Sequence, residues 1–126
     1  MNTLRHFKLA EFDSPDEPGS GAQHMNRDFL DMLDHARSIS GIPYRITSGY
    51  RSRAHHQELT RRGYPTAKNS PHLDGYAADI QATTSRERML ILNGLIRAGF
   101  NRIGIGKNYI HCDDHPEKDP DVCWLY

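Results

Sequence analysis

The sequence predicts an α+β fold in which about three helices cover a small antiparallel sheet. Apolar residues recur at helical spacing in two segments, 26–40 and 84–98, and each segment has a capping residue before it and a glycine after it. Short runs with strand character occur at residues 44–47, 76–82 and, as a pair, near the C-terminal end of the chain. A chain of 126 residues is long enough to bury one core, so a single domain over residues 1–126 is expected.

The N-terminal part of the chain is expected to be irregular. Residues 11–21 are rich in turn-forming residues, so residues 1–24 are interpreted as an irregular arm on the surface. The first helix is expected to begin after Asn26, a good N-cap, and to continue to Ser40, because Gly41 suits the position after a helix end.

The middle of the chain alternates short elements with turns. Residues 44–47 have strand character, and the turn at 49–52 leads into a second, polar helix that ends near Arg62. Residues 64–71 have a proline near each end and no periodicity, which predicts a loop. A strand at residues 76–82 is expected to follow it.

The C-terminal third begins with the third helix. Thr84 and Glu87 form a capping box, which predicts a helix that continues to Gly99. Its expected inward-facing residues are Met89, Leu90, Leu92, Leu95 and Ile96. Residues 102–105 and 109–113 are predicted to form an antiparallel hairpin. Residues 114–126 are interpreted as an irregular tail whose apolar end docks on the domain.

Charge and hydropathy exclude several classes of function. The chain has 16 Lys plus Arg and 16 Asp plus Glu, so no overall field favours nucleic acid or an anionic membrane. No apolar stretch is long enough to insert into a membrane, and the N-terminus lacks the apolar core of a secretion signal. The protein is therefore expected to be made in the cytoplasm, where Cys112 and Cys123 would be free thiols.

A carboxylate in a buried strand is the strongest functional signal from the residues alone. Asp79 lies in the run 76–82, where an ionised side chain is costly without a partner. His72 lies seven positions earlier, and His111 lies in a second strand-like run. Two imidazoles and one carboxylate would leave one position of a zinc tetrahedron free for water, which is the pattern of a catalytic zinc site.

Strand alternation supports this grouping. Asp79 faces one side of its strand, and His111 and Asp113 share one side of theirs, with Cys112 facing the opposite way. If the two strands are neighbours, Asp79, His111 and Asp113 converge. Spacing alone does not single out this set, because many His and Asp triples can be drawn in the chain. The remaining candidates are interpreted as solvated, hydrogen-bonded or turn residues: His6, His24, His35, His55, His56, Asp74, Asp114 and His115.

Four segments, in order, resemble a known family. Residues 70–79 read S-x-H-x-x-G-x-A-x-D, which is similar to the signature of peptidase family M15, the zinc D-Ala-D-Ala carboxypeptidases and L,D-endopeptidases. Residues 46–52 resemble the family's SGYRS segment, 99–106 its GF-x-GIG stretch and 110–113 its final HxD element. Vancomycin-resistance dipeptidases and many phage endolysins belong to this family, and the hedgehog signalling domain shares its fold. The resemblance implies a hedgehog-type α+β fold.

The resemblance also assigns roles to residues. It implies one zinc ion held by His72, Asp79 and His111. Arg51 would bind a carboxylate of the peptide substrate, for which a planar guanidinium is suited. Tyr50 would contact the substrate, and Ser70 would either contact it or orient the loop that carries His72.

The resemblance does not assign the general base to one residue. Many members carry an acidic base three residues before the last metal histidine, where this chain has Asn108. Asp113 is then the candidate catalytic residue. It would either accept a proton from the zinc-bound water or fix the orientation of His111.

The implied function is hydrolysis of peptidoglycan stem or crosslink peptides by a metal-activated water. The protein would act as a monomer on the cell wall, and a phage-encoded enzyme released by a holin or carried in a virion would fit. The alternative is a binding or structural module of the same fold that keeps zinc without catalysis. A structural site would need a fourth ligand, and Cys112, the nearest candidate, faces away.

Overall fold

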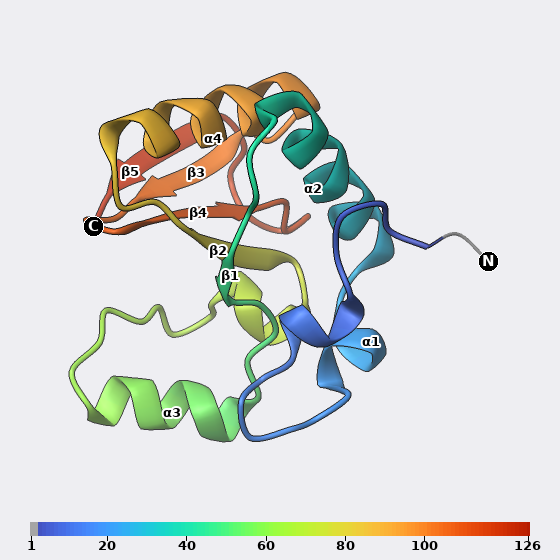
Figure 1. Cartoon of the computed structure of the whole chain (residues 1–126). Helices are drawn as coiled ribbons and strands as arrows, with labels where there is room; N and C mark the ends of the chain where they lie inside the picture. The colour runs from blue at the N-terminus through green and yellow to red at the C-terminus, as the bar shows by residue number, and fades with distance from the viewer. Residues whose placement is uncertain (1–2) are drawn as a thin grey trace.

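A five-stranded mixed sheet forms the centre of the protein in a computed structural model that describes residues 3–126 (Figure 1). The strand order is β1-β2-β4-β3-β5. The strands are β1 (Ile46–Ser48), β2 (Ala77–Gln81), β3 (Arg102–Ile105), β4 (Tyr109–Asp113) and β5 (Val122–Leu125). All neighbouring pairs are antiparallel except β3 and β5, which run parallel. The predicted α+β class and the hairpin of β3 and β4 are confirmed.

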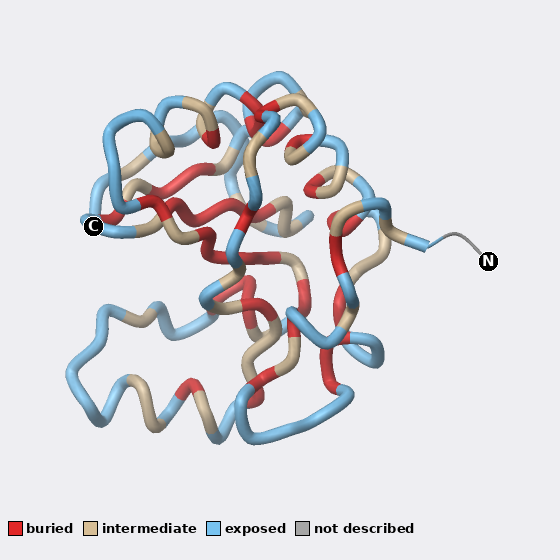
Figure 2. Tube along the Cα trace, in the orientation of Figure 1, coloured by how far each residue is buried: buried red, intermediate tan, exposed pale blue. Residues whose placement is uncertain are grey.

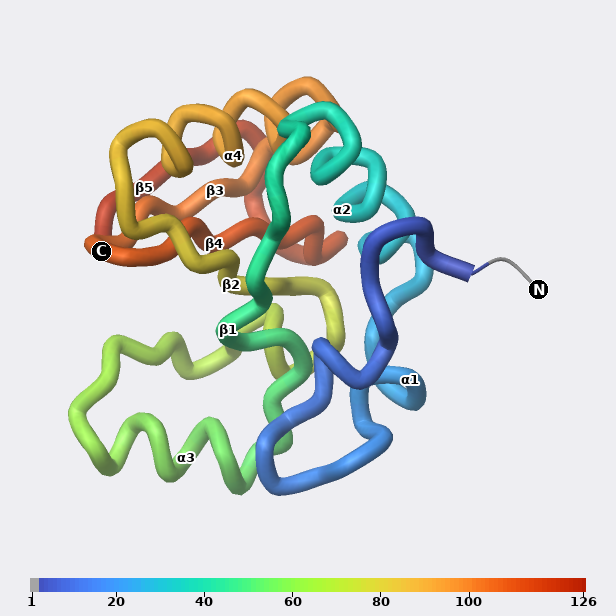
Figure 3. Tube along the Cα trace, viewed as in Figure 1, coloured from blue at the N-terminus to red at the C-terminus, as the bar shows by residue number. Residues whose placement is uncertain are grey.

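Two long helices, α2 (Arg27–Ser40) and α4 (Ser85–Ala98), pack together on one face of the sheet (Figures 1 and 3). The Asn26 side chain accepts a hydrogen bond from Phe29 N–H at the start of α2. Thr84 begins α4 with the predicted capping box. A glycine in the left-handed conformation follows each helix, so both ends are set by local sequence.

The apolar core lies between these helices and the sheet (Figure 2). Leu95 of α4 is buried there as predicted, but Met89 and Ile96 are 66% and 61% exposed. The inward stripe of α4 instead contains Ile91 and Gly94. A side chain at Gly94 would overlap Ser40 and Tyr44, so the absence of a Cβ lets α4 approach α2 closely at this point. Because α4 is apolar on more than one side, the periodicity alone did not indicate which stripe packs.

The N-terminal arm is ordered and contains two short helices, which corrects the expectation of an irregular segment over residues 1–24. The 3₁₀ helix η1 (Leu9–Phe12) and the helix α1 (Ser20–His24) lie within it. Phe12 is fully buried, and its ring packs edge-on against Phe7 at 5.3 Å between centroids. These apolar anchors outweigh the turn-forming composition around them.

The C-terminal tail also differs from expectation. Residues 122–125 form β5, which pairs with the outer edge of β3, so the sheet is not purely antiparallel. The chain passes from β4 through residues 114–121 to the far side of β3, and β5 therefore runs in the direction of β3.

The remaining helix, α3 (Arg53–Arg61), lies apart from α2 and α4 and contributes no residue to the apolar core (Figure 1). Two helices rather than three therefore cover the packed face of the sheet. Over residues 3–126, no helix has both the length and the apolar character needed to cross a membrane.

Candidate metal centre

The open face of the sheet carries the polar residues that strand alternation predicted. β2 and β4 are antiparallel neighbours, with Asp79 opposite His111 and Ala77 opposite Asp113. Asp79, His111 and Asp113 therefore point to the side away from α2 and α4. Cys112 points into the core, where its thiol contacts the carbonyl oxygen of Ala78 at 3.7 Å, so it is not part of the centre.

His72 reaches the same point from a short 3₁₀ turn, η2 (Pro71–Asp74). The Ser70 hydroxyl accepts a hydrogen bond from His72 N–H at 3.2 Å and caps this turn. Gly75 ends it with φ of +78°, and a Cβ there would overlap the carbonyl of His24. Glycine is therefore required at this position both by backbone conformation and by close approach.

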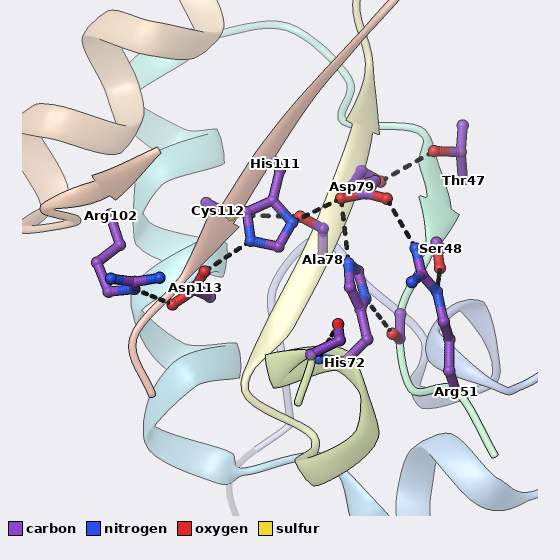
Figure 4. A network of polar contacts seen from close by, with 12 residues as sticks. Thr47, Ser48, Arg51, His72, Ala78, Asp79, Arg102, His111, Cys112 and Asp113 are labelled. Carbon is purple, nitrogen blue, oxygen red and sulfur yellow. Dashed lines mark hydrogen bonds and ion pairs between the residues drawn. The ribbon is translucent and has the colours of Figure 1, made fainter. Parts of the chain in front are cut away.

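Three possible ligand atoms face one another at the centre (Figure 4). One atom each from His72, Asp79 and His111 lies within 4.8 Å of the others, and all three residues are buried. His72 Nε2 is 3.2 Å from Asp79 Oδ1, and His111 Nδ1 is 2.9 Å from the same oxygen.

The outer nitrogens of both imidazoles have acceptors of their own. His72 Nδ1 lies 2.7 Å from the carbonyl oxygen of Gly49, and His111 Nε2 lies 2.6 Å from Asp113 Oδ2. A carbonyl or carboxylate oxygen only accepts, so each outer nitrogen carries the proton of a neutral ring. The inner nitrogens then direct lone pairs at a carboxylate oxygen, an arrangement that requires a cation or a proton between them. This donor set and its outer hydrogen bonds fit a divalent metal ion.

Burial and charge act on the three candidate ligands in different directions. Burial lowers the pKa of His72, which favours the neutral ring that a metal needs. Burial also opposes protonation of His111, but its hydrogen bonds to Asp113 and Asp79 outweigh this and raise its pKa. Burial opposes ionisation of Asp79, yet its interactions with the two imidazoles hold its pKa well below the ordinary value.

Asp113 is fully buried and has partners on both oxygens. Its Oδ1 accepts a hydrogen bond from Arg102 Nε at 2.6 Å, and its Oδ2 faces His111. Burial alone would raise its pKa, but the hydrogen bond from His111 and the charge of Arg102 lower it. The carboxylate is thus held ionised against the imidazole.

A pocket of about 390 Å³ opens onto the three residues. Arg51 and Ser70 line it, as expected for substrate contacts. Arg51 Nη2 is 3.4 Å from Asp79 Oδ2, and Arg51 Nε donates to Ser48 Oγ at 3.0 Å. The guanidinium therefore borders the site beside the metal position.

Two other predicted positions lie outside this pocket. The ring of Tyr50 stacks on His24 at 4.5 Å between centroids, and Tyr50 does not line this pocket, so its substrate contact stays a prediction. Asn108 is exposed and also lies outside it, so no side chain at position 108 faces the candidate ligands in this structure.

Sequence reasoning missed several pocket residues, among them Arg102, Tyr109, Trp124 and Tyr126. Trp124 and Tyr126 come from the tail, and the Trp124 ring lies 5.5 Å from that of His111. Their signal in the sequence is the aromatic-rich run 122–126, but the pairing of β5 with β3 that brings them to the site is not encoded locally.

Among the residues expected to have no functional role, Asp114 differs from expectation. It is half-buried rather than solvated, and its Oδ1 is buried without a hydrogen-bond partner. Burial, followed by the charge of Asp113, raises its pKa to about 6. His115 pairs with Asp74 at 2.8 Å, and the buried His56 lies 2.8 Å from the carbonyl oxygen of Ala67.

Two further cavities share lining residues with this pocket. A cavity of about 290 Å³ shares Arg51, Asp79 and Tyr109 with it and is lined further by Leu59 and Tyr64. Another cavity, of about 410 Å³, shares Asn69, Ser70 and Lys118. We call these three cavities together the groove.

The fold is similar to that of a solved structure, the Serratia marcescens L-Ala D-Glu endopeptidase ChiX. The two share 20% sequence identity with a TM-score of 0.55, over 72% of this chain and 80% of that one. This likeness concerns the fold. A search of curated proteins gave no match. The model of the Peptidase M15 family matches residues 5–113, which include Arg51, all three candidate ligands and Asp113. The chain therefore belongs to peptidase family M15.

Proposed function

We propose that this protein is a zinc-dependent endopeptidase that hydrolyses peptidoglycan stem or crosslink peptides. The observation that carries the proposal is the pair of imidazoles whose outer nitrogens are tied to Gly49 and Asp113. Their inner nitrogens consequently converge with Asp79 on one point of an open groove. Metal-binding histidines in proteins are usually oriented in this way.

His72 Nε2, Asp79 and His111 Nδ1 would hold one zinc ion, and all three residues line the pocket. When bound, zinc supplies a Lewis acid that polarises a peptide carbonyl and activates water at neutral pH. Arg51 is placed to bind a carboxylate or carbonyl of the substrate beside this position. Tyr109 and Tyr126 line the same pocket, and because burial raises the pKa of each, both are protonated hydrogen-bond donors there.

The two further cavities beside the pocket favour an endopeptidase over a carboxypeptidase. A carboxypeptidase needs room for only a short segment beyond the scissile bond, whereas two more cavities share walls with the pocket here. The fold neighbour is an L-Ala D-Glu endopeptidase, which makes that bond of the stem peptide the first candidate. The proposed place of action is the cell wall, reached as a monomer released by a holin or carried in a virion.

We assign Asp113 the role of a positioning residue. Both of its oxygens are already occupied by His111 and Arg102, and the residue is fully buried. It therefore fixes the ring of His111 and the tautomer that presents Nδ1 to the metal, as outer carboxylates do at histidine-bound zinc. Ser70 acts in the same manner on His72 by capping the turn that carries it.

A second candidate function, a zinc-containing binding module, is favoured by one observation. The only carboxylates that line the pocket among the described residues are Asp79 and Asp113, and both have partners. A pocket without a free general base suits binding as well as hydrolysis.

Digestion of purified peptidoglycan with product identification by mass spectrometry tests the proposal. Zinc-loaded protein should release defined stem-peptide fragments, and chelation should abolish this release. His72→Ala should abolish it as well, while His35→Ala, the same change at an exposed position on α2, should leave it intact. Zinc-loaded, folded protein that binds stem peptides but cleaves no wall type would support the binding module instead.

A further inference from the structure

The tail supplies an aromatic surface to the groove that lies outside the part of the chain matched by the family model. That match ends at residue 113, whereas Trp124 and Tyr126 line the same pocket as the candidate zinc ligands. Their rings lie 5.5 and 6.3 Å from the ring of His111 and 6.2 Å from each other. We call this pair, Trp124 and Tyr126, the aromatic platform.

The platform is held in place by the sheet. β5 pairs with β3 so that Trp124 lies beside Gly104, which in turn lies opposite His111. A Cβ at Gly104 would lie 2.6 Å from Trp124 Nε1 and from Tyr126 Cε2, so the missing side chain is what lets both rings lie over the sheet. The Arg102 guanidinium packs over the Trp124 ring at 5.3 Å, which fixes it further. A preorganised surface of this kind binds with little loss of side-chain entropy.

We propose that the aromatic platform binds the hexosamine ring, N-acetylmuramic acid, to which the stem peptide is attached. The proposal rests on the proposed function. Aromatic faces pack well against the C–H face of a pyranose, while the side chains of a stem peptide are mostly methyl groups and charged groups that need no ring pair. Asn69 and Lys118 line the same pocket and offer donors to the hydroxyl, acetamide and lactyl oxygens of such a sugar.

The position of the platform beside the metal also constrains the bond that is cleaved. Each extended residue spans about 3.3–3.6 Å, so only the lactyl linker and one residue separate the sugar from the bond between the first two stem residues. The bond after the fourth residue lies more than roughly 13 Å away from it. A platform whose Trp124 ring is 5.5 Å from that of His111 therefore places the sugar-proximal bond, between the first two stem residues, at the metal.

The kinetic test compares one stem peptide with and without the attached muramic acid. The parent protein should cleave the sugar-bearing substrate with a kcat/KM about tenfold higher, and Trp124→Ala should remove this preference while still cleaving the free peptide. Trp124→Phe, which keeps a flat ring, should retain most of it. Leu125→Ala is the matched control, because Leu125 is the neighbouring strand residue, is 78% exposed and does not line the pocket. Equal loss on both substrates in Trp124→Ala, or no preference in the parent, would overturn the proposal.

A binding test separates this inference from the proposed function. Trp124 is the only tryptophan of the chain, so its fluorescence reports directly on the platform. In chelator-treated protein, N-acetylmuramyl-L-Ala-D-isoglutamine should change this fluorescence at concentrations about tenfold lower than the sugar-free dipeptide does. Equal responses to the two ligands would exclude sugar binding. If the parent cleaves no substrate but shows the sugar-dependent response, the proposed function fails and the platform remains.

Discussion

Asp113 joins His111 of the candidate metal centre to the guanidinium of Arg102. It accepts hydrogen bonds from His111 and from Arg102, each at 2.6 Å. We expect Asp113→Asn to lower zinc affinity by about 10- to 100-fold, because an amide holds the His111 N–H less strongly than a carboxylate. Competition with a chromophoric chelator measures this affinity. Unchanged zinc affinity with complete loss of hydrolysis would instead identify Asp113 as the general base.

Asp114 offers a prediction about stability that is independent of the metal. Its pKa is raised to about 6, mainly by burial, so the folded protein binds a proton on this group more tightly than the unfolded chain does. Its contribution to stability is therefore favourable at low pH and is lost as the pH rises from about 4 through 6. Asp114→Asn should raise the free energy of unfolding at pH 7 by about 1 kcal/mol, after allowance for partial solvent screening, and have little effect at pH 4. Urea unfolding at both pH values measures this, with Asp119→Asn as an exposed control. No difference between the two variants at pH 7 would contradict the assignment.

Individual site residues could be predicted where a local sequence pattern fixes the direction in which the side chain points. Strand alternation predicted the sides that Asp79, His111 and Asp113 face, and the pairing of β2 with β4 brings them together. The glycine of the S-x-H-x-x-G motif marks the turn that carries His72. The substrate contact expected of Tyr50 came from the resemblance alone, because the residue lies in a turn, where sequence gives no side-chain direction. Its ring turns to His24 instead.

The N-terminal arm supports the two loops that supply His72 and Arg51. The carbonyl of Phe12 accepts a hydrogen bond from Tyr50 N–H at 2.9 Å, and a Cβ at Gly49 would lie 2.7 Å from Phe12 Cα. At the other end of the arm, Asn26 N–H donates to the Gly75 carbonyl at 2.9 Å. The arm therefore touches both loops through backbone contacts that leave no room for side chains.

Truncation of the arm's main anchor should act on the site as well as on stability. Phe12 is fully buried, so Phe12→Ala should lower the free energy of unfolding by about 3–5 kcal/mol. We expect zinc affinity to fall several-fold in this variant. Leu95→Ala would leave a cavity between α4 and the opposite face of the sheet. It should lower the free energy of unfolding by about 2–5 kcal/mol without a change in zinc affinity. Isothermal titration with zinc distinguishes the two, and equal zinc affinities would show that the arm does not position the site.

Elements with strong local signals were predictable, and elements defined by distant partners were not. The caps at Asn26 and Thr84 define α2 and α4 within the chain itself. The arm and β5 have weak local patterns, and their structure comes from burial of Phe12 and from pairing with β3. The same distinction explains why the sequence could group the three candidate ligands but did not indicate Trp124 and Tyr126.

At the scale of the whole molecule, a zinc ion held at the candidate metal centre would couple folding to zinc binding. Its three residues come from η2, β2 and β4, so a bound ion joins elements that are far apart in sequence. Zinc should therefore stabilise the native state by about 2.7 kcal/mol at a free concentration 100 times its dissociation constant. The melting temperature should rise accordingly, and chelation should reverse the rise.

The pH dependence of this zinc-linked stabilisation follows from proton competition. Zinc needs both imidazoles unprotonated, and the raised pKa of His111 means that protons compete there at a higher pH than for an ordinary histidine. The stabilisation should be largest near pH 8 and should decline as the pH falls to 5. Differential scanning fluorimetry with and without zinc, over this range, measures it. His72→Ala should lose the increment at every pH, whereas His35→Ala should keep it. If zinc raised the melting temperature of His72→Ala as much as that of the parent, the zinc would bind elsewhere. The outer nitrogens of both imidazoles are already hydrogen-bonded, so no other nitrogen of the buried site could replace that of His72.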